Sequence, residues 1–142
     1  MTIARVIEGH SFAIHSCDVA TSVRDAVELL ADHRIGALPV LDGGCIAGIF
    51  SERDVIHQLR AHGPAMLDLP VGQVMTAPVT TIDPQTSVMD ALALMTERRF
   101  RHLPVVHEGR MIGFVSIGDL VKHRIDRVEA EAEAMRSYIQ AV

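Results

Sequence analysis

Apolar residues along this chain follow two different periods, and the periods alternate in a fixed order. From Val23 to Ala31 the apolar positions recur every three or four residues, which is typical of one face of an amphipathic helix. Two short apolar runs, residues 35–41 and 45–50, then read as strands separated by a glycine turn. A second helix is expected to begin at Ser51. The pattern therefore predicts a helix–strand–strand–helix unit.

The same unit occurs a second time, 65 residues further along the chain. Residues 21–59 align without a gap on residues 86–124, and 14 of the 39 aligned positions are identical. The identical residues coincide with predicted caps, turns and core positions, so a chance likeness of composition is a poor explanation. Because a repeat of this length must bury its apolar face against a copy, we expect the function to lie between the two copies.

Each unit carries two further strand signals. We expect a short strand before each unit, near residues 13–16 and 79–82. A glycine stands inside the last strand of each unit, at Gly48 and Gly113, and indicates close approach by another backbone or by a ligand. Each copy thus reads as strand–helix–strand–strand–helix.

The segment between the copies is predicted to be ordered. Gly63-Pro64 ends the last helix of the first unit. Pro70 can start a short helix that runs to about residue 75, with Asp68 as its cap. No low-complexity stretch lies here, so we expect the two units to be packed together and not merely tethered.

A Ser-x-x-Asp sequence stands at the start of the last helix in each unit: Ser51 with Asp54, and Ser116 with Asp119. The free N–H groups and the positive dipole end of a helix N-terminus favour a phosphate, and a carboxylate there can accept hydrogen bonds from both hydroxyls of a ribose. The same pattern is also an ordinary capping box that needs no ligand. The local pattern leaves both interpretations open. It also opens the first helix of each unit, at residues 22–25 and 87–90.

The motifs GIFSERDV, FRHLPV and GRMIGFVSIGDL, repeated in register over about residues 10–125, resemble the tandem CBS-domain pair, also called a Bateman module. The resemblance implies an α+β fold, with two β-α-β-β-α repeats packed sheet to sheet in pseudo-twofold symmetry and a C-terminal helix added. The boundaries it implies are repeat 1 at 8–62, a linker with a short helix at 63–73, repeat 2 at 74–125 and a helical extension at 126–142.

The resemblance also implies two clefts for adenine-nucleotide ligands. In the first, Asp54 would hold the ribose hydroxyls, and the other lining residues would be Ser51, Arg53, Val79, Thr80, Phe100, Arg101 and His102. In the second, Asp119 would take the place of Asp54, with Ser116, Ile14, His15, Ile35, Gly36 and Ala37 around it. Arg101 and His102 can donate to phosphate, whereas their counterparts Gly36 and Ala37 carry no charge. We therefore expect unequal clefts, with the Asp54 cleft the stronger for phosphorylated ligands.

The function implied by this resemblance is a regulatory module that senses an adenine nucleotide and signals to a separate, unidentified protein by a change of packing. AMP is the first expectation for the ligand, and NAD or ATP would also fit. One alternative is a sensor of S-adenosylmethionine. Another is a ligand-free structural or protein-interaction dimer. An enzyme is not expected, because the sequence offers no nucleophile–base set, Walker loop or Rossmann fingerprint, and no catalytic cofactor is implied.

Composition narrows the possible partners and the location. The net charge of −5 argues against a nucleic-acid binder, which needs a basic face. No apolar run is long enough for a membrane span and no secretion signal is found, so a cytoplasmic protein is expected. Cys17 and Cys45 do not occupy equivalent positions and are expected to be buried or half-buried free thiols. The spacing of the histidines predicts no metal site.

Beyond the second repeat, apolar residues recur at alternating spacings of four and three in a segment without Gly or Pro after Gly118: Val121, Ile125, Val128, Ala132, Met135 and Ile139. This is the core pattern of a coiled coil. One interpretation is a helix that folds back on its own domain. Since the two repeats look complete without it, we favour a self-association stripe that strengthens a homodimer.

Overall fold

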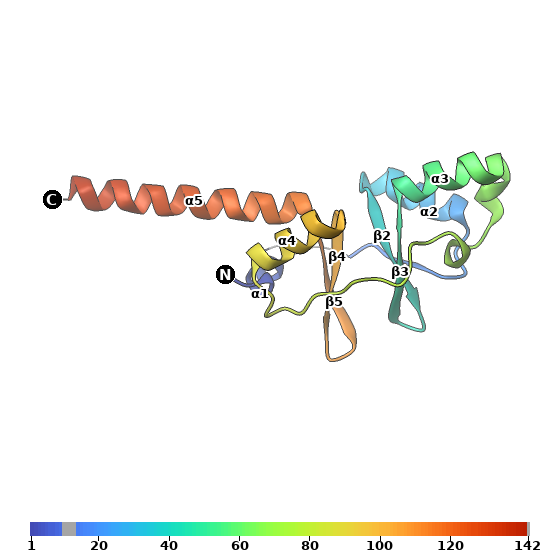
Figure 1. Cartoon of the computed structure of the whole chain (residues 1–142), viewed down its shortest axis with the longest axis horizontal. Coiled ribbons are helices and arrows are strands. Elements are labelled where there is room, and N and C mark those ends of the chain that lie inside the picture. Colours follow the sequence, from blue (N-terminus) through green and yellow to red (C-terminus); the bar gives the residue numbers. More distant parts are fainter. Residues whose placement is uncertain (10–13, 142) are drawn as a thin grey trace. The chain divides into compact units, whose positions relative to one another are not determined.

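The computed structural model describes residues 1–9 and 14–141. Figure 1 labels most of the helices and strands along these residues. Their bounds are α1 Ile3–Glu8, β1 Cys17–Asp18, α2 Val23–His33, β2 Ala37–Asp42, β3 Cys45–Ser51, α3 Glu52–His62, η1 Gly63–Asp68, η2 Val71–Gln73, α4 Val88–Arg98, β4 His102–His107, β5 Arg110–Ser116 and α5 Ile117–Gln140, where η denotes a 3-10 helix. The mixture of helices and strands confirms the α+β fold class.

The repeat found in the sequence is also a repeat of elements. The bounds of α4, β4 and β5 and the start of α5 each lie 65 residues after those of α2, β2, β3 and α3. The predicted helix–strand–strand–helix order is thus confirmed in both copies. The copies differ in their last helix: α3 ends at His62, before Gly63, whereas α5 continues without a break to Gln140.

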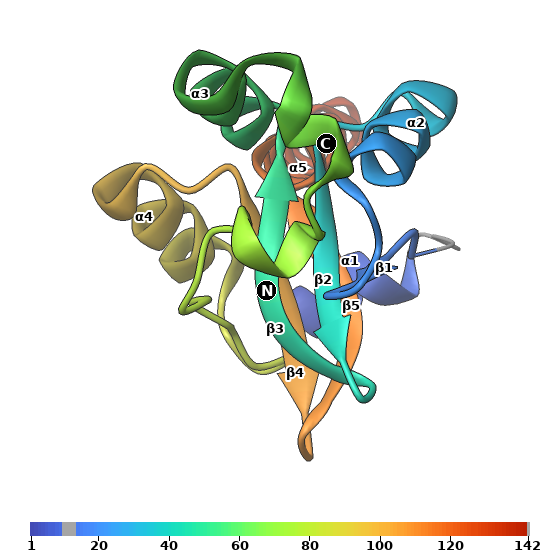
Figure 2. The ribbon, with the colours of Figure 1, turned by 90° about the vertical axis from the view of Figure 1, so that its right-hand side faces the viewer.

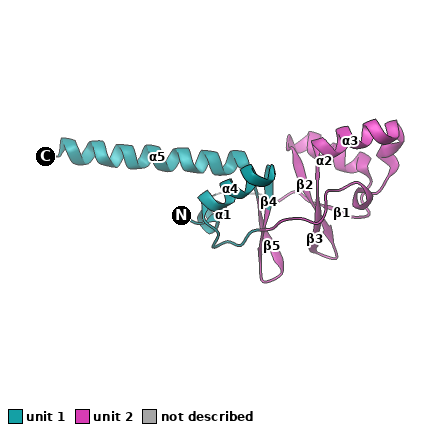
Figure 3. Cartoon of the chain, in the orientation of Figure 1, with its two compact units in different colours: residues 1–12, 82–103, 115–142 teal, residues 13–81, 104–114 magenta. Residues whose placement is uncertain are grey.

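The chain forms two compact units (Figure 3). Unit 1 consists of Met1–Phe12, Ile82–Leu103 and Val115–Val142, and unit 2 consists of Ala13–Thr81 and Pro104–Phe114. The hairpin of β4 and β5 therefore contributes to both units, with its strand ends in unit 1 and its tip in unit 2.

Unit 2 is built on the sheet β1–β2–β3. β1 pairs in parallel with β2, and β2 pairs antiparallel with β3, so that Ala37 lies opposite Ser51. Figure 2 shows β2 and β3 side by side above the turn that joins them. Gly43 and Gly44 form this turn with φ values of 58° and 85°, which glycine adopts without steric cost. The core contains the following buried residues from α2, the sheet and the 3-10 segments: Val23, Ala26, Leu30, Leu38, Val40, Phe50, Met66 and Val71.

Unit 1 includes the N-terminal helix α1, which the sequence pattern did not predict. Ile3 and Val6 of this helix are buried. Ile3 N–H donates to the Thr86 carbonyl at 2.9 Å, and Val88 N–H donates to the Met1 carbonyl at 3.0 Å, so the N-terminal segment is joined to the start of α4. A six-residue helix shows too few periods for its apolar face to be recognised in a sequence.

The strands expected near residues 13–16 and 79–82 are wrong in position or absent. Ala13 lies outside the described residues, residues 14–16 form no strand, and β1 occupies Cys17–Asp18 instead. Its position is set by β2, because Cys17 lies opposite Val40. Residues 79–81 are irregular, and only a single bridge residue, Ile82, follows them.

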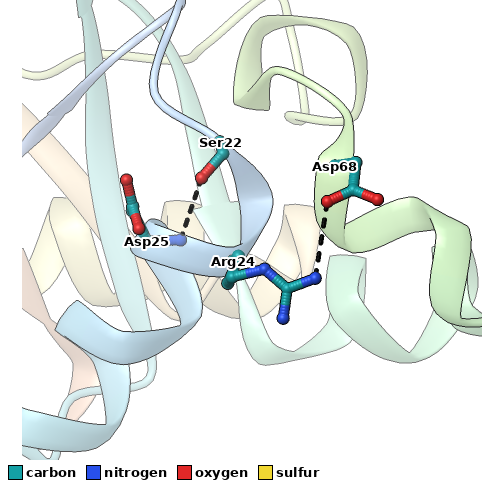
Figure 4. A network of polar contacts seen from close by, with 4 residues as sticks. All are labelled: Ser22, Arg24, Asp25 and Asp68. Carbon is teal, nitrogen blue, oxygen red and sulfur yellow. Dashed lines mark hydrogen bonds and ion pairs between the residues drawn. The ribbon is translucent and has the colours of Figure 1, made fainter.

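The helix expected from Pro70 to about residue 75 is also wrong. Leu69 and Pro70 are extended, and only Val71–Gln73 forms a 3-10 turn. The extended backbone is used for long-range pairing, since Val23 N–H donates to the Leu69 carbonyl at 2.9 Å. Asp68 therefore caps no helix. It ends η1, and its carboxylate accepts a hydrogen bond from Arg24 at 3.4 Å (Figure 4).

The predicted caps of the first helices are confirmed in part. Ser22 Oγ accepts from the Asp25 N–H at 3.2 Å, as Figure 4 shows, and Ser87 Oγ accepts from the Asp90 N–H at 3.0 Å. The reciprocal carboxylate bond of a full capping box is found in the described residues at α3 and α5.

Candidate functional site

The Ser51–Asp54 segment lies where β3 ends and α3 begins, and a capping box holds both side chains. Ser51 N–H donates to Asp54 Oδ2 at 2.9 Å, and the Ser51 hydroxyl contacts the same oxygen at 3.1 Å. In return, Asp54 N–H donates to Ser51 Oγ at 3.4 Å. The carboxylate is half-buried and is fixed at the N-terminus of the helix. The capping interpretation of the sequence is thus confirmed.

The second oxygen of Asp54 is engaged by a residue that the sequence pattern did not indicate. Thr76 Oγ1 donates to Asp54 Oδ1 at 2.9 Å across 22 residues of chain. Backbone bonds of 3.0 Å and 2.8 Å between Ile49 and Thr76 hold the threonine beside β3. Gly48 makes this approach possible, because a Cβ there would lie 2.6 Å from Met75 Sδ and 2.8 Å from the Thr76 carbonyl.

The glycine in β3 was therefore a correct signal of close approach by another backbone. It could have located Thr76 only together with knowledge of which segment approaches. That information is long-range and leaves no local pattern.

The start of α5 repeats the capping box with a different outcome. Ser116 N–H donates to Asp119 Oδ2 at 2.8 Å, and Asp119 N–H donates to Ser116 Oγ at 3.1 Å. Within the part of the chain that the structure describes, no hydroxyl donates to Asp119 as Thr76 does to Asp54. The two aspartates are therefore held alike by their helices but differ in their further partners.

The helix N-termini have fewer free amides than the sequence suggests. Glu52 N–H donates to the Gly36 carbonyl at 3.1 Å, and Ile117 N–H donates to the Arg101 carbonyl at 2.8 Å. Since the amide of Asp54 donates to Ser51, only that of Arg53 has no acceptor in the described residues among the first three of α3. Two of the three amides expected to be free for phosphate therefore have acceptors: the Gly36 carbonyl, just before β2, and the Ser51 hydroxyl.

The other residues expected at the Asp54 site are distributed over both units. In unit 2, the Arg53 side chain is exposed, while Val79 and Thr80 are half-buried in an irregular segment. In unit 1, Phe100, Arg101 and His102 lie between α4 and the first residue of β4, and Arg101 is exposed. Of the residues expected at this site, the structure shows Ser51 and Asp54 in direct contact, and Thr76 joins them as an additional residue.

Of the residues expected around Asp119, Ser116 lies with it in unit 1, and the others lie in unit 2. Ile14, Ile35 and Gly36 are half-buried, and Ala37 is buried as the first residue of β2. His15 stacks on His33 with ring centroids 3.5 Å apart. The last contact was not expected from the sequence.

Cys17 in β1 has a clearly shifted pKa. Burial, helped by the neighbouring charge of Asp18, raises the pKa of the Cys17 thiol to about 11. Cys45 is exposed, which corrects the expectation that both thiols are at least half-buried. In the described residues, no three His, Cys, Asp or Glu side chains converge as a metal site would require. No helix within those residues is long and apolar enough to cross a membrane.

Comparison with known proteins assigns the chain to a family. The sequence pattern described as "CBS domain" matches residues 11–61 and again residues 71–126. The chain belongs to the CBS-domain family and contains two tandem CBS domains.

Particular relatives agree with this assignment. The chain is 37% identical over 129 residues to the mitochondrial CBS domain-containing protein CBSX3 of Arabidopsis thaliana. This alignment covers 87% of this chain and 63% of the length of CBSX3. A solved structure of a protein with CBS domains from Burkholderia ambifaria is 40% identical and has a TM-score of 0.83, covering 89% of this chain and 95% of that one. The structure of CBSX2 in complex with AMP is 28% identical with a TM-score of 0.73, covering 88% and 96%.

Proposed function

We propose that this chain is a regulatory module that binds an adenosine-containing ligand, with AMP preferred to NAD or ATP, and that Asp54 holds the ribose. The observation that carries the proposal is that the two oxygens of the Asp54 carboxylate accept different numbers of hydrogen bonds. Oδ2 receives both contacts from Ser51, whereas among the described residues Thr76 alone donates to Oδ1. Because a carboxylate oxygen offers two lone pairs, Oδ1 retains capacity for a ribose hydroxyl.

Family relationship supports the choice of ligand. CBSX2, which shares 28% identity over nearly the same length, has been crystallised with AMP. An adenosine-containing ligand in this chain is consistent with that relative. AMP, ATP and NAD all contain the adenosine, so the preference among them must come from the phosphate contacts.

The phosphate contacts favour a ligand with few phosphates. Among the first three amides of α3, that of Arg53 alone has no acceptor in the described residues, so the helix N-terminus can contribute little backbone donation. The Arg53 side chain is exposed and can donate to a phosphate. The roles of Arg101 and His102 as further phosphate donors are taken from the resemblance to CBS-domain pairs and form part of the proposal. A single phosphate matches this small set of donors better than three.

Asp119 belongs to the second, weaker site of the proposal. Its carboxylate is held by the same capping box as Asp54, but no hydroxyl like that of Thr76 contacts it in the described residues. In the repeat alignment the counterparts of Arg101 and His102 are Gly36 and Ala37, which carry no charge. We expect it to take an adenosine with little added affinity from a phosphate.

Isothermal titration with AMP tests the assignment. Asp54→Ala is expected to lower the affinity roughly 10- to 100-fold, the usual effect of removing a hydrogen-bonded charged group. Asp119→Ala is the matched control, because it removes the same capping carboxylate from the other repeat. Circular dichroism shows whether each variant is folded. Equal losses of affinity in the two variants would contradict the proposed inequality.

A ligand-free interaction module is the competing function. Thermal unfolding separates it from a sensor, because a ligand that binds only the folded state raises the melting temperature. We expect AMP to do so. No response to AMP, ATP, NAD or S-adenosylmethionine would favour the interaction module, and mass spectrometry of small molecules released from the purified protein would identify a ligand that co-purifies.

A further inference from the structure

α5 is the longest helix among the described residues, and its C-terminal part is exposed throughout. It begins at the capping box of Ser116, and Leu120 in its first turns is completely buried. α1 and α4 contact the helix in unit 1. From Arg124 to Ala141, however, every residue is exposed. Figure 1 shows this part of α5 as a single straight segment that extends beyond α1 and α4.

The exposed part of α5 carries an apolar stripe, which we call the α5 seam: Val121, Ile125, Val128, Ala132, Met135 and Ile139. The five large side chains of the seam are between 43% and 65% exposed. This excludes the interpretation that the helix folds back on its own unit. A helix of this length gains most of its stability in water from packing of its apolar face, so an uncovered seam indicates a missing partner.

The spacing of the seam indicates what kind of partner fits. Alternating steps of four and three residues give an average repeat of 3.5, and this repeat keeps a seam facing a second helix in a left-handed coiled coil. In heptad notation, Ile125, Ala132 and Ile139 occupy a positions, and Val121, Val128 and Met135 occupy d positions. The residues at the flanking e and g positions then determine which helix binds to the seam and in which orientation.

The flanking charges are complementary to a second copy in one arrangement. In a parallel, in-register pair, each g residue faces the e residue of the next heptad in the other helix. Arg124 would then face Glu129 of the second copy, and Glu131 would face Arg136. All four side chains are exposed in the structure. Twofold symmetry doubles each pair, so the flanks contain four attractive contacts. We propose that α5 binds α5 of a second copy of this chain as a parallel, in-register coiled coil.

The opposite orientation is disfavoured by the same charges. In an antiparallel pair with the seams fully overlapped, Glu129 would face Glu129 of the second copy, and Lys122 would face Arg136. A staggered antiparallel pair would match Arg124 with Glu131, but it would leave Met135 and Ile139 beyond the overlap. The intrahelical ion pairs Arg127–Glu131 and Arg136–Glu133, at 3.3 Å and 3.8 Å, are exposed. Such pairs contribute little and can exchange partners.

Substitutions that reverse the charges of flanking residues in the full chain test both the partner of α5 and the orientation of the two helices. Sedimentation equilibrium without nucleotide measures the dimer dissociation constant. R124E turns two attractive contacts repulsive and is expected to raise this constant roughly tenfold. The double variant R124E/E129R restores the parallel pairing and should return the constant to near the wild-type value. Rescue by R124E/E131R instead, or a constant that R124E leaves unchanged, would overturn the proposal.

A disulfide provides an independent measurement of register. Met135→Cys places a thiol at a core position, where it would face its own copy in a parallel in-register pair, and Ser137→Cys places one on the outer face. Both are made with Cys45→Ser, because Cys45 is the exposed native thiol. Oxidation in dilute solution should cross-link Met135→Cys and not Ser137→Cys. Equal cross-linking of the two, or none in either, would contradict the coiled coil. Neither experiment depends on a nucleotide, so the outcome stands apart from the ligand proposal.

Discussion

Cys17 illustrates how the position of a single residue changes its chemistry. It lies in the short strand β1 opposite Val40, in the core of unit 2, and is 8% exposed. Burial removes the water that would stabilise a thiolate, and the carboxylate of Asp18 disfavours the negative charge further, so the pKa rises from 9.0 to about 11. The thiol is therefore neutral and unreactive near neutral pH.

This pKa predicts a loss of stability in alkaline solution. Between pH 9 and about 11 the unfolded thiol releases its proton while the folded one retains it. The contribution of Cys17 to the free energy of unfolding is complete below pH 9 and decreases as the pH rises through this range. Urea unfolding at several pH values measures the decrease. Cys17→Ala is expected to show a smaller pH dependence than the wild type, and equal slopes would contradict the assignment.

Residues near the candidate site show what a local pattern can predict. The Ser-x-x-Asp pattern predicted a cap at α3 and α5, and both capping boxes are present because the bonds run between residues three apart. The hydroxyl of Thr76 and the carbonyl of Gly36 could not be predicted. Each reaches the start of α3 from a segment distant in sequence, and the folded chain alone determines which segment that is.

At the scale of elements, β3 depends on a position that tolerates no side chain. A Cβ at Gly48 would lie 2.8 Å from the Thr76 carbonyl, and this carbonyl is fixed by its bond with Ile49. Since a backbone atom cannot move aside as a side chain does, the segment that carries Thr76 would have to shift. The glycine thus links the strand to the contact that completes the Asp54 environment.

Gly48→Ala is accordingly expected to lower the free energy of unfolding by about 1–3 kcal/mol, as overpacking does in a filled core. Gly118→Ala is the matched control: the added Cβ meets Ser116 Oγ at an ordinary 3.7 Å, and alanine favours the helix. Urea unfolding should show opposite signs for the two variants. Equal or reversed effects would mean that the contact at β3 does not limit stability.

Elements were predictable where their pattern was long or repeated. The first helix and the hairpin of each copy begin close to their predicted positions, because two aligned copies support each assignment. The short elements were not predictable. β1 is placed by pairing with β2, and the Leu69–Pro70 backbone pairs with the chain before α2 and so does not coil into a helix. In both cases a distant partner decides the conformation.

At the scale of the whole molecule, the ligand proposal and the coiled-coil proposal concern different residues. Asp54 lies in unit 2, and the α5 seam lies in unit 1. Nucleotide binding at Asp54 and pairing of the helices should therefore be separable by mutation.

We expect R124E to weaken self-association while AMP still raises the melting temperature. Asp54→Ala should show the reverse, with a dimer constant near the wild-type value and a reduced thermal response to AMP. Sedimentation equilibrium and thermal unfolding of both full-length variants measure the two properties. If each variant impaired both properties equally, nucleotide binding and self-association would belong to one interface.

The continuity of α5 has a mechanical consequence. The helix runs unbroken from the cap that contains Asp119 to Gln140, so its 24 residues span about 36 Å. A change in the direction of the helix axis at the Ser116–Asp119 segment would therefore move the C-terminal end of α5 the furthest. A tilt of about 10° at this segment would displace that end by roughly 6 Å, more than the rise of one helical turn. A small adjustment around Asp119 would thereby produce a large displacement of the C-terminal end of the helix.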